Sequence, residues 1–266
     1  MEQEQINIVE LITQTINTIF SEFLSSIDNS LYSILDELTF ISENILDNSY
    51  LEKILGSSTS NSIILIANAL LIGFLLYYGI SLLLSHLTFS RNEHPIQFIF
   101  KIIIFGILIN SSYFFIKQII FFNSTISLAI LDIGENLFDE EISFSSLIEN
   151  LNSIIYEEDQ NFNIFSIYGI IRNFISFGML NLLFSYSLRY IMIKVFIVIT
   201  PFAILTLISE KTSWFFKSWF RTFLSLLFLQ DLVAIILLIT FSIDFSESDL
   251  FSNLMYVRFY LCFNTF

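Results

Sequence analysis

The residue types that usually carry out catalysis are sparse in this sequence and lie apart from one another. His86 and His94 are its two histidines, and Cys262 is its one cysteine. The histidines do not stand in the spacing of a metal site, and the seven glycines are scattered singly, so no phosphate-binding loop or nucleophile elbow is present. We therefore expect no enzyme activity, no metal and no cofactor. Any ATP used by an assembly would be hydrolysed by another subunit.

Asp231 is the first candidate for a functional residue, because it follows Gln230 in the middle of the apolar run 222–243. A carboxylate in the centre of a membrane costs roughly 3 kcal/mol unless it is neutral, paired or hydrated, so we expect it to face the protein interior. Three basic residues could pair with it: Arg172, Arg189 and Lys194. The acid could fix helix packing, as an ion pair or in its protonated form, line an aqueous path or relay protons.

A second group of polar residues combines indoles with cations: Trp214, Lys217, Trp219 and Arg221. Such a group is typical of a helix anchored at the headgroups of a bilayer. It could instead dock a cytoplasmic partner if it faces inward. Pro201 lies within an apolar run and predicts a helix kink.

Long apolar runs must position these residues, and they predict a membrane protein. Hydrophobic residues make up 55% of the 266 residues, and no charged residue occurs between Lys53 and Arg91. The run Ile63–Leu84 exceeds the roughly 20 residues needed to cross a bilayer. The net charge of −14 argues against nucleic-acid binding by a basic groove.

The acidic residues indicate the topology. Nineteen of the 25 Asp and Glu lie in two blocks, 1–55 and 132–163, in which Lys53 is the one basic residue. Because Lys and Arg gather on the cytoplasmic side of a membrane, we expect both blocks to face outward. The short loop 85–97 contains Arg91 and is expected to be cytoplasmic.

We predict an all-α polytopic membrane protein with about five transmembrane helices, two N-terminal amphipathic helices and a helical acidic outer loop. The two N-terminal helices separate at 28–30, and they either pack on each other or the membrane surface or join copies of the chain. The predicted regions are 1–56, extracytoplasmic and amphipathic; 57–122, a two-span hairpin whose second span is 98–117; 123–163, the acidic outer loop; 164–243, spans three to five; and 244–266, a C-terminal tail.

Residues 163–209 allow two interpretations. They form either two spans, 165–187 and 191–208, that turn near Arg189, or one span with a re-entrant or interfacial piece. Two spans place the block 210–221 outside, whereas one span places it inside, in agreement with the positive-inside rule.

The stretch Arg189–Leu238 resembles the core of the TrbL-type proteins, the polytopic inner-membrane subunits of type IV secretion and conjugation machines. The resemblance rests on the order and spacing of several features: Arg189-Tyr190, Pro201-Phe202-Ala203, Thr212, Phe216, Trp219, Phe223 and Gln230. Asp231 departs from the pattern, since similar proteins usually have an apolar residue there. The layout of N-terminal region, hairpin, outer loop and further spans agrees with the family plan over the rest of the chain.

The resemblance implies a channel or scaffold subunit in a bacterial inner membrane, with an extracytoplasmic N-terminus and about five spans. It also implies association with copies of itself, with other secretion-system membrane subunits and with a transfer ATPase, and transient contact with DNA or protein cargo. The alternatives are a small-solute transporter or permease subunit, or a membrane-disrupting or immunity protein of a mobile element.

Overall fold

The computed structural model describes residues 8–46, 49–55, 62–88, 94–150 and 167–242. All regular structure in these ranges is helical, which confirms the predicted all-α class. The long helices are α1 (Ile8–Thr39), α3 (Ile63–Thr88), α4 (Pro95–Asn110), α5 (Ser112–Phe138), α7 (Ile167–Leu205) and α8 (Ser213–Phe241). The short ones are two 3₁₀-helices, η1 (Glu43–Leu46) and η2 (Thr206–Ile208), the α-helix α2 (Ser49–Leu55) and a helical stretch at 144–150.

The N-terminal region forms one long helix where the sequence predicts two. α1 continues without interruption through 28–30, so the predicted break between two amphipathic helices is wrong. Asp, Asn and Ser each lower helix propensity by at most about 0.7 kcal/mol, and no Gly or Pro stops the helix there. After α1, Phe40 still donates its N–H to the carbonyl oxygen of Asp36 at 2.9 Å, and the chain then leaves the helical path.

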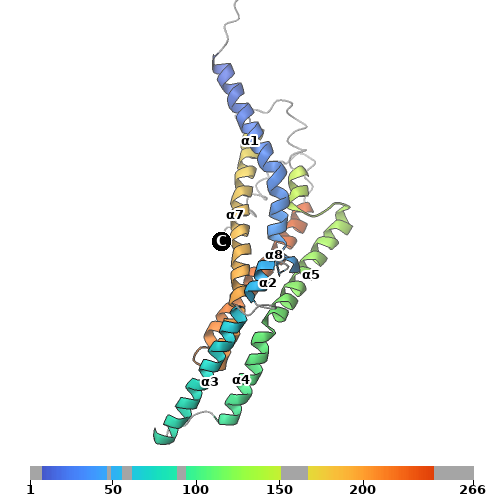
Figure 1. Cartoon of the computed structure of the whole chain (residues 1–266). Helices are drawn as coiled ribbons and strands as arrows, with labels where there is room; N and C mark the ends of the chain where they lie inside the picture. Colours follow the sequence, from blue (N-terminus) through green and yellow to red (C-terminus); the bar gives the residue numbers. More distant parts are fainter. Residues whose placement is uncertain (1–7, 47–48, 56–61, 89–93, 151–166, 243–266) are drawn as a thin grey trace, which may run out of the picture. The chain divides into compact units, whose positions relative to one another are not determined.

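α3 and α4 lie side by side as a helical hairpin (Figure 1). α3 begins where Ser62 caps it, since the Ser62 hydroxyl oxygen accepts the N–H of Leu65 at 3.2 Å. The rings of Tyr78 and Phe98 stack with their centroids 3.6 Å apart. The hairpin therefore has a specific aromatic contact besides its aliphatic packing.

A reciprocal amide pair also joins the two helices of the hairpin. Asn68 donates to Asn110 at 3.1 Å, and Asn110 donates back to Asn68 at 3.3 Å. Both side chains satisfy their polar atoms on a surface that is otherwise apolar. Such pairs hold apolar helices together in lipid, where burial alone gives little driving force.

The predicted second span, 98–117, is divided at Ser111, between α4 and α5. The Asn110 side chain donates to the carbonyl oxygen of Gly106 at 2.7 Å, so a polar side chain competes with the helical ladder where α4 ends. α5 begins at the next residue and includes 119–131. The apolar stretch 119–131 thus continues as a helix beyond the predicted end of the second span.

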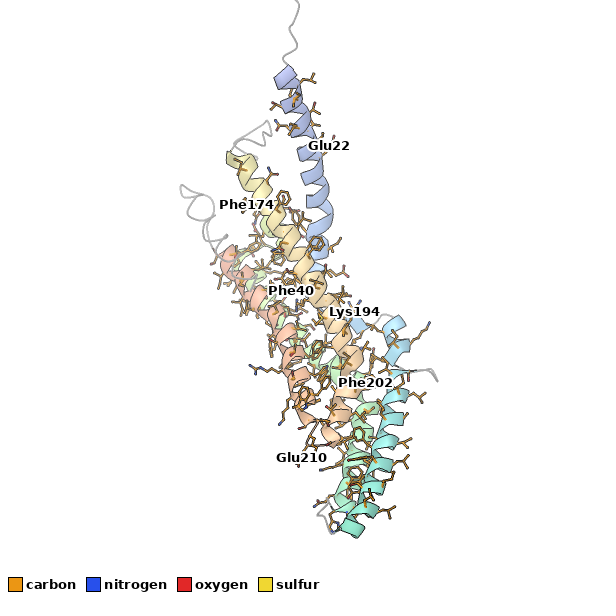
Figure 2. All side chains as sticks on the ribbon, turned by 90° about the vertical axis from the view of Figure 1, so that its left-hand side faces the viewer. Glu22, Phe40, Phe174, Lys194, Phe202 and Glu210 are labelled. Atoms are coloured by element: carbon orange, nitrogen blue, oxygen red, sulfur yellow. The ribbon has the colours of Figure 1, made fainter. Side chains whose placement is uncertain are left out.

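Residues 163–209 contain one long helix. α7 has Arg189 and Pro201 in its interior, so the prediction of two spans that turn near Arg189 is wrong. One undivided helix takes their place, and the re-entrant or interfacial piece of the other interpretation is not a separate element among the described residues 167–209. No Gly or Pro interrupts the sequence near Arg189, and the Pro201 ring removes one backbone N–H without ending the helix. Figure 2 shows Lys194 and Phe202 along α7 and Glu210 in the turn that follows. The kink at Pro201 stays a prediction.

A tight turn, residues 209–212, joins η2 to α8. The Thr212 hydroxyl donates to the carbonyl oxygen of Thr206 at 2.7 Å, and the Thr212 N–H donates to that of Ser209 at 3.1 Å. Thr212 is one of the residues on which the family resemblance rests, and its structural role is to close this turn. α8 then includes both the predicted aromatic and basic group and the predicted final span as far as Phe241.

The chain divides into two compact units. The first unit consists of Met1–Phe40, Ser127–Leu188 and Asp231–Phe266, and the second of Ile41–Ile126 and Arg189–Gln230. One core of the second unit contains Ile41, Ile45, Leu46, Leu55, Ile116, Ile120, Ile193, Ile197, Ala203, Trp219, Phe223 and Leu227. A second core contains Ala67, Phe98, Ile102, Ile109, Ile204, Leu205 and Ile208. The segment after α1 is therefore part of the interior of the second unit.

Four described helices are long and apolar enough to cross a membrane: Ile63–Leu84 of α3, Ser112–Phe138 of α5, Asn173–Ile208 of α7 with η2, and Ser213–Phe241 of α8. α4, with 16 residues, is shorter. The number is four where five were predicted, because α7 is undivided. Apolar side chains of α3 such as Leu65, Ile72 and Leu76 are exposed in the isolated chain, as lipid-facing side chains are.

Part of the acidic block, the predicted outer loop, is ordered as a helix. Leu147 and Ile148 are buried in the helical stretch 144–150. The rest of the predicted outer loop, 151–163, and the tail 244–266 lie outside the described residues.

Candidate functional site

Gln230 is the most deeply buried polar side chain of α8 among the described residues, with 1% of its surface exposed. Its Oε1 accepts the N–H of Ile41 at 3.1 Å, and its Nε2 donates to the carbonyl oxygen of Ile41 at 3.4 Å. One side-chain amide thus bonds both the N–H and the carbonyl oxygen of Ile41, which follows the end of α1 by two residues. Leaving such groups buried without a bond costs about 1–3 kcal/mol each.

Arg189 of α7 reaches the same part of α8. It is 5% exposed, and its Nε donates to the carbonyl oxygen of Leu226 at 2.8 Å. Its Nη2 donates to Gln230 Oε1 at 3.3 Å and lies 3.5 Å from the carbonyl oxygen of Leu227. Carbonyl oxygens in a helix have a second lone pair for such donors. The guanidinium is therefore surrounded by the acceptors of α8, and it ties α7 to α8.

Asn123 of α5 completes the arrangement. Its Nδ2 donates to the carbonyl oxygen of Leu227 at 3.2 Å, and it is 3% exposed. We call Asn123, Arg189, Gln230 and the backbone of Ile41 the polar cluster. Its members come from α5, α7, α8 and the segment after α1, all within the second unit.

The position of Gln230 along α8 determines the depth of the polar cluster. α8 has 29 residues, of which Gln230 is the eighteenth. Because about 20 helical residues cross the hydrocarbon of a bilayer, every stretch of α8 long enough to cross includes Gln230. If α8 spans the membrane, the polar cluster lies within the hydrocarbon. Buried polar residues at that depth mark functional sites more often than surface ones do.

Asp231 belongs to the first unit. It is buried, and the hydroxyl of Ser127 on α5 donates to its Oδ1. The predicted pairing of Asp231 with a basic residue stays a prediction. Lys194 has its Nζ 4.2 Å from the centroid of the Tyr190 ring, a cation–π contact within α7. The side chain of Arg172 lies outside the described part of the chain.

The aromatic and basic group occupies the first turns of α8 and divides into two sets. Trp214, Lys217 and Arg221 are exposed. Trp219 is buried, and its indole N–H donates to the carbonyl oxygen of Phe196 at 3.2 Å. Trp219 therefore packs α8 against α7. Anchoring at the headgroups, or docking of a partner, stays a prediction for the exposed three.

Within the first unit, Asp36 joins α1 to the second acidic block, residues 132–163. Its carboxylate accepts the N–H of Phe144 at 2.8 Å, the N–H of Ser145 at 3.2 Å and the Ser145 hydroxyl at 2.7 Å. These donors lie at the N-terminus of the helical stretch 144–150, where the helix dipole favours a negative charge. An acid of α1 thus caps a helix more than 100 residues later in the sequence.

No group of three or more His, Cys, Asp and Glu that could hold a metal ion occurs among the residues that the structure describes. His94 is the exposed N-cap residue of α4. The side chain of His86 and all of Cys262 lie outside the described part of the chain. The buried polar side chains described above, Asn123, Arg189 and Gln230, are engaged in bonds between helices.

Four site residues do not stand out in the sequence as functional candidates: Asp36, Ile41, Asn123 and Ser127. Asn123 and Ser127 are four residues apart in an apolar run, so their polarity in that setting was a usable signal. Asp36 lies among many other acids, and nothing distinguishes it from them. Ile41 contributes its backbone, which no residue type reveals.

Comparison of the chain with protein-family models, with curated proteins and with solved structures finds no match. Function is therefore inferred from the helices, the polar cluster and the residues of Arg189–Leu238.

Proposed function

We propose that the chain is an integral inner-membrane subunit, TrbL-like, of a type IV secretion or conjugative transfer machine, and that it helps to form the channel for DNA or protein. Its role is structural, without catalysis of its own. The coarser conclusion, a multi-pass helical membrane protein, follows from the four long apolar helices.

The hydrogen bond between Arg189 and Gln230 carries the proposal. Arg189 and Gln230 are the first and last of the residues on which the resemblance to the TrbL-type core rests. They lie 41 positions apart in the sequence. Their contact makes the two ends of the pattern parts of one site, which gives a physical reason for their order and spacing. Two further residues of the resemblance have structural roles: Thr212 closes the turn before α8, and Trp219 packs α8 against α7.

Four crossings give a topology that agrees with the placement of charge. An extracytoplasmic N-terminus puts the loop with Arg91 and the turn with Lys211 on the cytoplasmic side, and the acidic block 132–163 outside. With four crossings the block 210–221 lies inside, in agreement with the positive-inside rule, whereas the number of spans departs from the five that are usual in the family. The residue after α8, Ser242, faces outward in this arrangement.

Cargo would pass through an assembly that contains several copies of the chain and other secretion-system membrane subunits. A transfer ATPase would supply the energy. The outward acidic block cannot hold DNA by charge, because like charges repel the phosphate backbone. Repulsion of this kind would favour release of a nucleic acid on the outer side. A chain in which the nine acids of 132–163 are replaced by Asn or Gln should then release DNA more slowly.

Deletion of the chain from its host tests the function. We expect plasmid transfer or secretion to fall to background, and to return with the intact chain and with Gln118→Ala, a change at an exposed position of α5. Arg189→Leu should not restore it, and affinity purification of the intact chain should retain the transfer ATPase. Normal transfer in the deletion strain would exclude the proposal.

Accessibility of single cysteines tests the topology independently, in a chain whose native cysteine is replaced by Cys262→Ser. A membrane-impermeant maleimide applied to intact cells should label Glu141→Cys and Ser242→Cys, and should spare Lys211→Cys until the membrane is opened. Labelling of Lys211→Cys from outside would restore the five-span topology. All three positions are at the surface of the described chain.

One observation favours the transporter alternative. The chain leaves the helix at Ile41 beside buried polar side chains, and transporters often bind solutes at such interruptions. Uptake of small solutes by proteoliposomes that contain the purified chain alone would support this second candidate. A solute-binding protein encoded beside the chain would favour it too, whereas a transfer ATPase and a coupling protein would favour the channel.

A further inference from the structure

Three apolar side chains between α1 and α2 are buried although the chain there is not α-helical. Residues 41 and 42 have no regular structure and 43–46 form η1; the side chains of Ile41, Ile45 and Leu46 are at most 5% exposed, whereas Asn44 is exposed. They share a core with Ile120 of α5 and Phe223 of α8. Residues 41–46, the embedded segment, thus fill part of the interior between helices of the second unit.

Burial without an α-helical ladder demands other partners for the backbone. In lipid, non-helical backbone is tolerated where protein groups or enclosed water satisfy it. Gln230 supplies two such bonds to Ile41, at 3.1 and 3.4 Å. We call these two bonds the Gln230 latch. Gln230 lies in every stretch of α8 that is long enough to cross a bilayer, so the latch lies at hydrocarbon depth.

We propose that residues 41–46 are a membrane-embedded segment held in place by the Gln230 latch, and that opening the latch admits water to the interior of the second unit. The inference requires that α8 crosses the membrane, and it holds for a channel or a transporter alike. It differs from the predicted extracytoplasmic location of the whole region 1–56, since the end of that region enters the bilayer.

The chemistry of the latch explains why a single side chain suffices. Gln230 Oε1 accepts from Ile41 and from Arg189 together, and Nε2 donates to Ile41, so the amide uses donors and acceptors at once. An apolar side chain of equal length would leave the two Ile41 groups without these bonds. Water would then be their best partner, and the closed arrangement would lose population by about tenfold or more.

The test measures water access to Ile45, which is 5% exposed. The full chain carrying Cys262→Ser and Ile45→Cys is placed in proteoliposomes and treated with a membrane-impermeant maleimide. Glu141→Cys, at an exposed position, gives the reference rate. We expect Ile45→Cys to react at least tenfold more slowly than the reference, and Gln230→Met to raise its rate about tenfold.

Leu227→Ala is the matched control. Leu227 is fully buried in the same core, one turn before Gln230, so its truncation loosens packing without touching the amide. We expect it to raise the rate less than threefold. Gln230→Glu keeps the acceptor and loses the donor, and should give an intermediate rate. If Gln230→Met does not purify as a single species, the labelling rate of Gln230→Glu takes its place in the comparison with Leu227→Ala.

Two results would overturn the proposal. Ile45→Cys that reacts as fast as Glu141→Cys without a change at Gln230 would show that the segment is not embedded. Equal rates for Gln230→Met and Leu227→Ala would show that loosened packing, and not the amide, controls access. Loss of secretion without any change in the labelling rates would bear on the proposed function and not on the latch.

Discussion

Gly134 of α5 is the position where one added methyl group should matter most. A Cβ placed on it would lie 2.7 Å from Cγ1 of Ile142 and 2.8 Å from Cδ1 of Leu238. Overpacking of this kind costs about 1–3 kcal/mol, and the higher helix propensity of Ala returns about 1 kcal/mol. We therefore expect Gly134→Ala to lower the free energy of unfolding by about 1 kcal/mol.

Gly178 of α7 supplies a matched control in the same unit. An added Cβ there meets no atom within 4 Å, so Gly178→Ala should gain helix propensity without a clash. The expected gain is up to about 1 kcal/mol. The two variants should then differ by about 2 kcal/mol, a factor of roughly 30 in the ratio of folded to unfolded chain.

Unfolding of the purified chain in mixed micelles, titrated with SDS and followed by tryptophan fluorescence, measures this difference. A double-mutant cycle with Ile142→Ala identifies its cause. The clash should be relieved in the double variant, so the two changes should couple by about 1 kcal/mol or more. Gly134→Ala as stable as Gly178→Ala, or a cycle without coupling, would refute the close approach of α5 to Ile142 and Leu238.

Three further contacts make predictions of their own. Asp36→Ala should remove the cap of the helical stretch 144–150 and cost it about 1 kcal/mol, seen as faster amide hydrogen exchange there, whereas an unchanged rate would contradict the capping contact. Trp219→Phe should cost at least about 1 kcal/mol through the lost indole hydrogen bond, whereas Trp214→Phe at the surface should stay within about 0.5 kcal/mol. Asn68→Leu and Asn110→Leu should couple by about 0.6 kcal/mol in a double-mutant cycle, and additive effects would mean that the amide pair does not form in the membrane.

Composition and hydropathy were sufficient to predict the helical class and the apolar helices, because a bilayer permits few spanning structures. The predicted helix boundaries at 28–30 and near Arg189 were wrong, because the local residue types that suggest a helix end were outweighed by the backbone and tertiary hydrogen bonds of a continuous helix. Residues 28–30 have good capping side chains, yet an uninterrupted helix satisfies more backbone groups than a break would. Arg189 predicted a turn at the membrane surface, whereas its donors find carbonyl oxygens of α8 in the interior.

The candidate site was predictable in part for a similar reason. Gln230, Arg189 and Asp231 attracted attention because polar residues in apolar runs are costly. Their partners did not, since Ile41 acts through its backbone and Asn123 through a carbonyl oxygen of another helix. Sequence spacing reveals residues on one helix face, and it does not reveal which carbonyl oxygen of a distant helix they meet.

The length of α7 has a mechanical consequence. Its 39 residues extend about 58 Å, and a tilt of 40° would still leave about 44 Å along the bilayer normal, against a hydrocarbon thickness of about 30 Å. If α7 crosses the membrane, at least one end of the helix must therefore stand clear of the hydrocarbon. Within the second unit, the guanidinium of Arg189 and the carbonyl oxygen of Leu226 that accepts from it tie α7 to α8, so we expect a displacement of α7 at Arg189 to move α8 with it.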